Sequence, residues 1–202
     1  MPSSKPVTRV CVLRSGGEYK PAHVQWLARQ VPGLVCLSDV EVPGVPVVPM
    51  QHDFPGWWSK IELFSNAIPG DLLYFDLDTV VLGDVEALEA VGQTTMLSDF
   101  YRLNQPASGL MYIAQQDKQP VWEAWMKNPE THMQRCRTTQ HWGDQGFLRD
   151  LLPCKRWQDL MPGAVVSFKV HCKAGVPAGA QVVCFHGQPR PWSANQSWIP
   201  SC

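Results

Sequence analysis

Residues 7–37 decide the fold class, and they read VTRVCVL, RSGGEYK, PAHVQWLARQV, PG and LVCL in order. Val7–Leu13 is rich in β-branched and apolar residues, which is typical of a buried strand. Pro21–Val31 has apolar residues at helical spacing and a proline in its first turn. Pro32 and the glycine after it end this helix, and Leu34–Leu37 predicts a second strand. A strand, a helix and a strand at this spacing predict a mainly parallel sheet covered by helices.

The rest of the chain continues this pattern, with less regularity toward the C-terminus. Residues 40–56 are rich in proline and valine and predict an extended crossover. Further helices are predicted at Trp57–Asn66, Asp84–Val91, Pro120–Lys127 and Gly143–Leu152. Further strands are predicted at Asp71–Asp78, Thr94–Ser98, Leu110–Ile113, Ala164–Phe168 and Val182–Phe185. We therefore expect one Rossmann-like α/β domain over residues 1–202, with a mainly parallel central sheet flanked by helices and an irregular C-terminal half.

The composition narrows the class of protein. Of 202 residues, 45% are hydrophobic and 17% charged, which excludes a disordered polyelectrolyte. Lys and Arg number 17 against 18 Asp and Glu, so the whole chain has no electrostatic footprint for nucleic acid or an anionic membrane. The apolar run Val10–Leu13 is too short for a signal peptide, and no run is long enough to span a bilayer. We expect a soluble, cytoplasmic protein.

An acidic segment, Tyr74–Thr79, is the first feature that suggests chemistry. Side chains alternate along a strand, so Asp76 and Asp78 are expected on one face at its carboxyl end. Two such carboxylates repel each other unless a cation lies between them. The pair predicts a divalent metal that can in turn hold a diphosphate. The alternative is a turn that ends the strand, with Asp78 capping the backbone near Thr79.

A second feature lies near the C-terminus, where residues 182–192 read VVCFHGQPRPW. An apolar strand delivers His186 to a glycine, and a proline-rich loop presents Arg190. Imidazole combined with two carboxylates suits Mn²⁺ better than Mg²⁺, and the planar guanidinium group suits phosphate oxygens. The alternative has His186 hydrogen-bonded in the core and Arg190 on a solvated turn.

The ordered set of segments resembles a glycosyltransferase of the GT-A fold. The greatest similarity is to the glycogenin-like family 8 group and its small bacterial and phage relatives. The matching segments are Trp57–Lys60, Tyr74–Asp78, Ser108–Met111, Gly143–Gln145 and Phe185–Trp192. The resemblance implies metal-dependent transfer of a hexose from a nucleotide-diphosphate sugar to a hydroxyl acceptor, with retention of configuration. A UDP-sugar is the preferred candidate for the donor. It leaves the acceptor open among a glycan, a protein and a modified nucleobase.

The same resemblance implies roles for individual residues. Asp144 and Gln145 would be catalytic, beside the transferred sugar. The metal ligands would be Asp76, Asp78 and His186. The nucleotide-sugar-binding residues would be Ser15, Gly16, Tyr19, Lys60, Asp76, Leu77, Ser108, Gly187 and Arg190. Two structural alternatives remain, because Asp144 could cap the helix that follows it, and Lys60 could be a solvated residue beside Trp57 and Phe64 in its helix.

Three further alternatives stay open. Cys184 stands close to the position where family members often carry the metal-binding histidine, so it competes with His186 as third ligand. Ala107 stands where the family has asparagine, which leaves room for a degenerate protein that binds nucleotide sugar or glycan without turnover. Asp76 to Val80 also resembles the nucleophile motif of haloacid-dehalogenase-type phosphatases, in which Asp76 would be the nucleophile.

Overall fold

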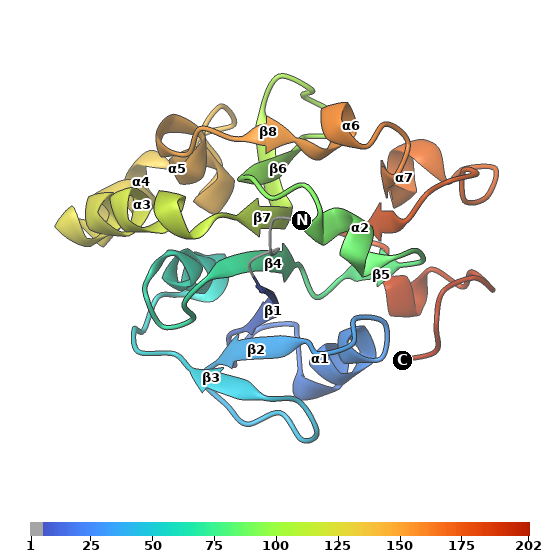
Figure 1. Cartoon of the computed structure of the whole chain (residues 1–202), viewed down its shortest axis with the longest axis horizontal. Coiled ribbons are helices and arrows are strands. Elements are labelled where there is room, and N and C mark those ends of the chain that lie inside the picture. The colour runs from blue at the N-terminus through green and yellow to red at the C-terminus, as the bar shows by residue number, and fades with distance from the viewer. Residues whose placement is uncertain (1–5) are drawn as a thin grey trace.

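The computed structural model describes residues 6–202 and contains two β-sheets surrounded by helices (Figure 1). Residues 1–5 lie outside the described residues. The predicted domain 1–202 and the prediction of no signal peptide both include these residues. The strands are β1 (Val7–Leu13), β2 (Val35–Ser38), β3 (Val47–Pro49), β4 (Asp71–Phe75), β5 (Thr79–Val81), β6 (Thr95–Ser98), β7 (Pro106–Ile113), β8 (Lys155–Arg156), β9 (Val165–Ser167) and β10 (Val182–Cys184). The helices are α1 (Pro21–Ala28), η1 (Gly56–Phe64), α2 (Val85–Glu89), α3 (Gln115–Lys127), α4 (Pro129–Arg135), α5 (Gly143–Leu151), α6 (Trp157–Leu160), α7 (Phe168–His171) and η2 (Pro191–Ser193).

The large sheet has the strand order β3-β2-β1-β4-β7-β6-β8. Strands β3, β2, β1 and β4 are parallel, as β6 and β8 are, and only β7 runs antiparallel to its neighbours β4 and β6. The small sheet has the order β5-β10-β9. The predicted fold class, α/β with a mainly parallel central sheet flanked by helices, is confirmed.

Alternation along the central strands separates two apolar layers. In β4, Leu72 and Tyr74 belong to the layer under η1, α3 and α5, whereas Leu73 and Phe75 belong to the layer shared with α1, α2 and the small sheet. All four of these side chains are buried. A strand that is buried on both faces reads as a continuous apolar run, and this is why the sequence 72–75 predicted it so clearly.

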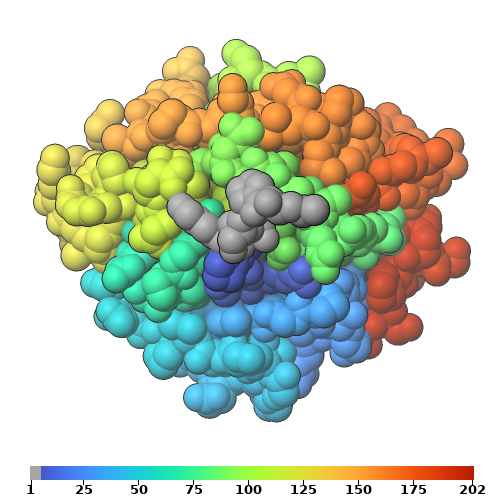
Figure 2. Space-filling view, viewed as in Figure 1, coloured from blue at the N-terminus to red at the C-terminus, as the bar shows by residue number. Residues whose placement is uncertain are grey.

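The C-terminal segment closes the molecule against its N-terminal half. Figure 2 shows this segment in red beside the green region of β5 and α2 and the blue N-terminal region. The indole Nε1 of Trp26 donates to the carbonyl of Pro200 at 2.9 Å, and Arg29 donates to the carbonyl of Ser201 at 3.0 Å. Among the described residues, no helix combines the length and apolarity needed to cross a bilayer.

Several predicted boundaries were wrong. Strand β4 ends at Phe75, so Asp76 and Asp78 lie in the turn that leads to β5 and do not alternate along a strand. The segment around Trp57 is a 3-10 helix instead of an α-helix. Helix α3 begins five residues before Pro120, and strand β7 begins at Pro106 instead of Leu110. The sequence predicted none of the short elements β5, β8, α4, α6 and α7.

Candidate active site

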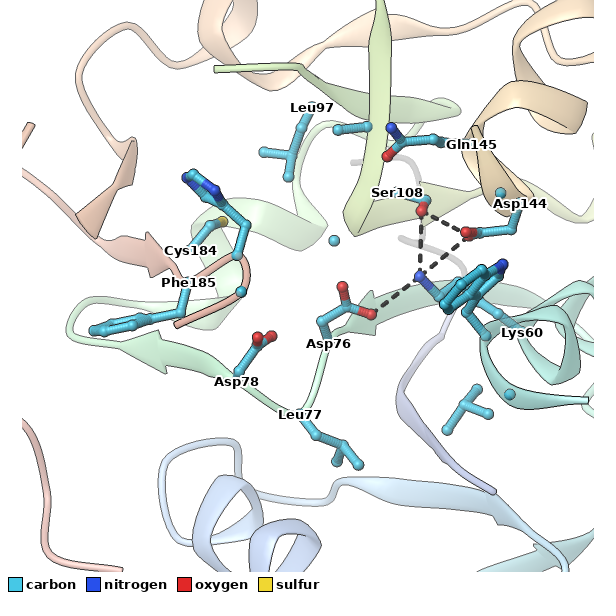
Figure 3. Close-up of a pocket in the computed structure, with 18 of the residues that line it drawn as sticks. Lys60, Asp76, Leu77, Asp78, Leu97, Ser108, Asp144, Gln145, Cys184 and Phe185 are labelled. Carbon is cyan, nitrogen blue, oxygen red and sulfur yellow. Dashed lines mark hydrogen bonds and ion pairs between the residues drawn. The ribbon is translucent and has the colours of Figure 1, made fainter. Parts of the chain in front are cut away.

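A cavity of about 680 Å³ opens beyond the end of β4 (Figure 3). It brings together most of the residues that the sequence singled out: Tyr19, Lys60, Asp76, Leu77, Asp78, Ser108, Asp144, Gln145, His186, Gly187 and Arg190. Ser15 and Gly16 are not among its lining residues. The amide of Ser15 instead donates to the carboxylate of Asp39 at 2.8 Å, whereas the flanking residues Arg14 and Gly17 do line the cavity.

Lys60 is the cation on one side of the cavity, and it is only 6% exposed. Its Nζ lies 3.1 Å from Asp76 Oδ1 and 3.1 Å from Asp144 Oδ2, and it donates to Ser108 Oγ at 3.2 Å (Figure 3). Burial alone would lower the pKa of Lys60, but the charges of Asp144 and Asp76 outweigh it and raise the pKa above its usual value. The ammonium group therefore stays protonated and joins two carboxylates from distant segments. Lys60 is not a solvated helix residue.

Asp144 is held by this lysine and by Ser108, whose hydroxyl donates to Asp144 Oδ2 at 2.6 Å. Helix α5 begins at Gly143 with Trp142 as its N-cap residue, so Asp144 lies inside the first turn. The interpretation of Asp144 as a helix N-cap is therefore wrong. Its side chain is directed to the cavity, next to Gln145 in the same lining.

Asp76 is positioned by the end of β4. Its amide donates to the carbonyl of Gly109 at 2.9 Å, and its carbonyl accepts from the amide of Thr79 at 3.1 Å, which closes the turn. The hydroxyl of Tyr74 donates to its carboxylate. A Cβ atom on Gly109 would lie 3.2 Å from Asp76 Oδ2, so glycine at this position leaves room for the carboxylate beside β7.

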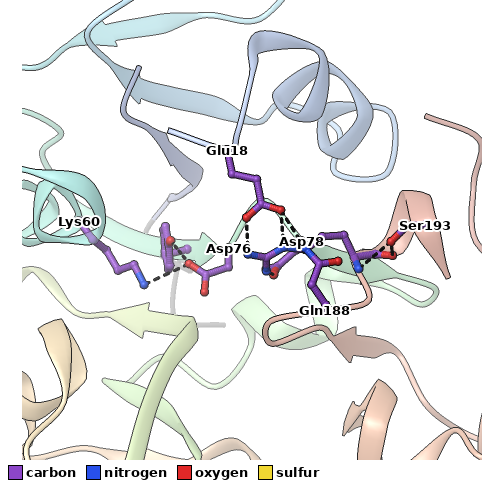
Figure 4. Close-up of polar contacts among 8 residues, drawn as sticks. Glu18, Lys60, Asp76, Asp78, Gln188 and Ser193 are labelled. Atoms are coloured by element: carbon purple, nitrogen blue, oxygen red, sulfur yellow. Dashed lines mark hydrogen bonds and ion pairs between the residues drawn. The ribbon is translucent and has the colours of Figure 1, made fainter. Parts of the chain in front are cut away.

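Asp78 turns toward the opposite side of the cavity, where its buried carboxylate pairs with Arg190 (Figure 4). The same guanidinium group donates to both carboxylate oxygens of Glu18, with Nε at 3.0 Å and Nη2 at 2.6 Å. It also lies 5.1 Å from the ring centroid of Tyr19. Burial and the charge of Asp76 raise the pKa of Asp78 to about 7, although Arg190 and a hydrogen bond from Tyr19 act in the opposite direction.

Comparison with known proteins gives matches in structure alone. No model of a known protein family and no curated protein sequence matches the chain. The glycosyltransferase GlyE of Streptococcus pneumoniae TIGR4 superposes with a TM-score of 0.57 at 13% identity, covering 94% of this chain and 57% of that one. The galactosyltransferase LgtC, in complex with donor and acceptor sugar analogs, superposes with a TM-score of 0.57 at 12% identity, covering 93% of this chain and 90% of that one. The bifunctional glycosyltransferase WbbM superposes with a TM-score of 0.58 at 11% identity, covering 96% of this chain and 50% of that one.

The chain has the GT-A glycosyltransferase fold. It spans 57% of the GlyE chain and 50% of the WbbM chain, so these neighbours carry additional structure. Similarity at 10–13% identity establishes the shared fold.

A metal ion in this cavity would find part of its ligands in the two carboxylates of Asp76 and Asp78. Asp76 and Asp78 line one cavity and offer only oxygen atoms, and Mg²⁺ is commonly held by one or two carboxylates together with substrate phosphates. Over residues 6–202, no three His, Cys, Asp or Glu side chains are grouped so that they could hold one ion. The remaining ligand positions would fall to diphosphate oxygens and water.

The structure does not group His186 with the two aspartates. Its Nε2 lies 2.7 Å from Ser167 Oγ, and its ring stacks on Phe100 with centroids 5.8 Å apart. Burial, with smaller contributions from the charges of Asp78 and Asp76, raises the pKa of the Cys184 thiol. A thiol that stays protonated is a poor ligand for these ions, so the two carboxylates are the donors that the GT-A site of this chain offers.

The sequence does not reveal several of the residues that line the cavity. Glu18 follows the Ser15–Gly17 turn, and its contact with Arg190 spans 172 positions, which no local pattern reveals. Trp57, the first residue of the predicted helix Trp57–Asn66, is 53% exposed. An exposed tryptophan is uncommon and therefore points to a binding site. Its exposure can be predicted from the sequence only when the type of helix that carries it is known.

Proposed function

We propose that this protein is a metal-dependent glycosyltransferase that moves a hexose from a nucleotide-diphosphate sugar to a hydroxyl acceptor. The preferred candidate for the donor is a UDP-sugar. The observation that carries the proposal is the pair of ion clusters in one cavity of a GT-A fold, Lys60 with Asp76 and Asp144 on one side and Arg190 with Asp78 on the other. The two clusters provide separate places for a sugar and a diphosphate. Retention of configuration is proposed from the family 8 resemblance.

The leaving group of such a reaction is a nucleoside diphosphate, on which negative charge grows as the glycosidic bond breaks. Fixed positive charge in a partly buried site stabilises this charge more in the transition state than in the ground state. Arg190 is placed to bind phosphate oxygens with its planar fork. A divalent cation held by Asp76 and Asp78, when bound, supplies further charge to the diphosphate.

On the other side of the cavity, Asp144 and Gln145 would contact the transferred sugar. Lys60 holds the Asp144 carboxylate in place, so that Asp144 can accept hydrogen bonds from sugar hydroxyl groups or stabilise positive charge at the anomeric carbon. The hydroxyl group of Ser108 donates a second hydrogen bond to this carboxylate and limits its rotation. Tyr19 lines the cavity on the Arg190 side, where the nucleoside would lie.

A screen of nucleotide sugars tests the proposal. The purified protein is heated with UDP-glucose, UDP-galactose, UDP-N-acetylglucosamine or GDP-mannose, each with Mn²⁺, with Mg²⁺ or with EDTA. A ligand that binds only the folded form raises the melting temperature, and at 100 times its Kd it stabilises by about 2.7 kcal/mol. We expect one nucleotide sugar to raise the melting temperature with a divalent ion and to be hydrolysed slowly to the diphosphate.

Two results would contradict this proposal. Hydrolysis of p-nitrophenyl phosphate without turnover of any nucleotide sugar would favour the phosphatase with Asp76 as nucleophile. Binding of a nucleotide sugar without any hydrolysis or transfer, in every ion condition, would favour a degenerate binding protein. Both metals are tested because the case for Mn²⁺ over Mg²⁺ depended on His186, which the structure places with Ser167.

Glu18→Gln is expected to tighten the binding of UDP by roughly three- to fivefold. The Glu18 carboxylate occupies the guanidinium fork of Arg190 that a phosphate needs, and its side chain is 45% exposed. An exposed ion pair contributes less than about 1 kcal/mol, so a diphosphate can displace it, and removal of the glutamate charge removes the competition. Titration calorimetry with UDP and Mg²⁺ measures the change, with Glu41→Gln as a control at an exposed site off the cavity. Weaker binding by the variant would mean that Glu18 orients Arg190 productively.

A further inference from the structure

Two large aromatic side chains stand exposed at the cavity, on the side that carries Asp144. Trp57 is 53% exposed and Trp142 is 54% exposed, and both line the cavity. Their ring centroids lie 6.1 Å apart with the ring planes at 40°. Exposed apolar surface next to a polar cavity marks a binding site, because leaving it in water costs free energy that a ligand recovers.

Each tryptophan is placed by the element that carries a charged residue of the site. Helix η1 is a 3-10 helix, in which side chains three positions apart lie on one side, so Trp57 lies on the same side as Lys60. Trp142 stands two residues before Asp144, as the N-cap residue of α5. The aromatic pair is therefore adjacent to the place where the proposed transferred sugar would react.

The loop that carries Trp142 is fastened. The amide of Gly143 donates to the carbonyl of Cys136 at 2.9 Å, and Arg149 donates to the carbonyl of Gln140 at 2.9 Å. Gly143 has a φ of +61°, and a Cβ atom there would lie 3.1 Å from Trp57 Nε1. Glycine at this position thus permits both the turn and the close approach of the Trp57 indole. A surface that is fixed before binding avoids part of the entropy cost of association.

We propose that Trp57 and Trp142 form the acceptor subsite and bind a sugar ring of a saccharide acceptor. This inference rests on the proposed function. A pyranose ring has a face of C–H groups, which packs on an indole, and hydroxyl groups around its edge. Packed on this pair, the ring would direct an edge hydroxyl toward Asp144 and Gln145. Rigid aromatic side chains provide such contact area at a small loss of side-chain entropy.

The charges of the cavity favour a neutral saccharide over a nucleic acid. The lining includes five carboxylates and three permanent cations. Each of these cations is paired with carboxylates: Arg14 with Asp39 and Asp53, Lys60 with Asp76 and Asp144, and Arg190 with Glu18 and Asp78. Proteins that stack bases of single-stranded nucleic acid combine aromatic side chains with a positively charged groove. Lys60, the lining cation on the side of the two tryptophans, is already neutralised by two carboxylates, so that side offers little attraction to a polyanion.

Direct binding tests the subsite without relying on turnover. Protein labelled with ¹⁵N in its indole groups is titrated, in the presence of UDP, with lactose, maltose, cellobiose or chitobiose, and the signals of Trp57 and Trp142 are followed. We expect at least one disaccharide to shift both signals, with a Kd that rises tenfold or more in Trp57→Ala and in Trp142→Ala. Trp142→Phe should recover most of the affinity, because a phenyl ring still stacks. Met126→Ala, at an exposed apolar residue of α3 off the cavity, is the matched control and should leave Kd unchanged.

Turnover distinguishes failure of this inference from failure of the proposed function. With the nucleotide sugar that the protein hydrolyses, both alanine variants should lower the ratio of transfer to hydrolysis at least tenfold. An unchanged ratio, with the nucleotide sugar still consumed, would overturn the subsite and leave the function standing. Shifts of both indole signals by the oligonucleotide dT10 and by none of the disaccharides would also overturn it. If no nucleotide sugar is consumed, the proposed function fails, and the indole titration alone decides whether the pair binds saccharide.

Discussion

Asp76→Asn is expected to reduce sugar transfer roughly 1,000-fold while the protein keeps its fold. The substitution keeps the shape of the side chain and removes its charge, and loss of one preorganised electrostatic contact commonly lowers kcat by about 100- to 1,000-fold. Asp76 contacts Lys60 and Tyr74 and is proposed to hold the cation, so its charge acts on both sides of the cavity. Steady-state release of UDP from the nucleotide sugar measures the loss.

The stability of this variant should change little. Asp76 is about one-third exposed, and its charge both attracts Lys60 and repels Asp78, so the two effects oppose each other. We expect the melting temperature to move by no more than about 4 °C, which corresponds to roughly 1 kcal/mol in a domain of this size. Asp159→Asn makes the same chemical change at an exposed position of α6 and serves as the control. Full transfer activity in Asp76→Asn would exclude the proposed role of the carboxylate.

Lys60→Met is expected to lower the free energy of unfolding by about 3 kcal/mol and to abolish measurable transfer. The side chains of Lys60 and Asp144 are each 8% exposed, and removal of one partner of a buried ion pair leaves the other charge unpaired. The loss lies at the lower end of the usual range because Asp76 remains in contact with water. Denaturant unfolding, followed by tryptophan fluorescence, measures the change.

A double-mutant cycle separates the ion pair from the packing of the lysine side chain. Lys60→Met combined with Asp144→Asn removes both charges of the buried pair, so the double variant should be more stable than the sum of the two single changes predicts, by 1 kcal/mol or more. Strict additivity would mean that the 3.1 Å contact between these groups contributes nothing to stability.

The sequence predicted the central elements of the fold because they are buried on both faces or have a clear period. Strand β1 was predicted with its observed bounds, and β4 was predicted from its first residue. Strand β4 ends at Phe75 because the chain turns directly after it, with the Thr79 amide donating to the Asp76 carbonyl, and the apolar run before the turn does not show where the strand stops. Short elements such as β5 and β8 form only against partners that are distant in the chain, and local propensity carries little information on them.

The candidate site was predictable where chemistry is local. Asp76, Asp78 and Arg190 come from short patterns that retain their meaning in the fold, and all three line one cavity. The placement of His186 was not predictable, because its ring faces Ser167 and the aromatic Phe100, which come from other segments. The exposure of Trp57 was missed because a period of 3.6 residues was assumed where the helix has a period of three.

The ion pair between Glu18 and Arg190 has a consequence for the synthesis of the protein. It joins positions 172 residues apart, and the second carboxylate on Arg190, Asp78, is 112 residues away. A nascent chain that has left the ribosome only as far as α5 already has Lys60, Asp76 and Asp144 but has no cation for Asp78. The cluster of Lys60, Asp76 and Asp144 can therefore form before residue 190 is synthesised, whereas the pairing of Asp78 with Arg190 has to wait for it. Any fragment that ends before residue 190 should be catalytically silent, even if its central sheet is intact.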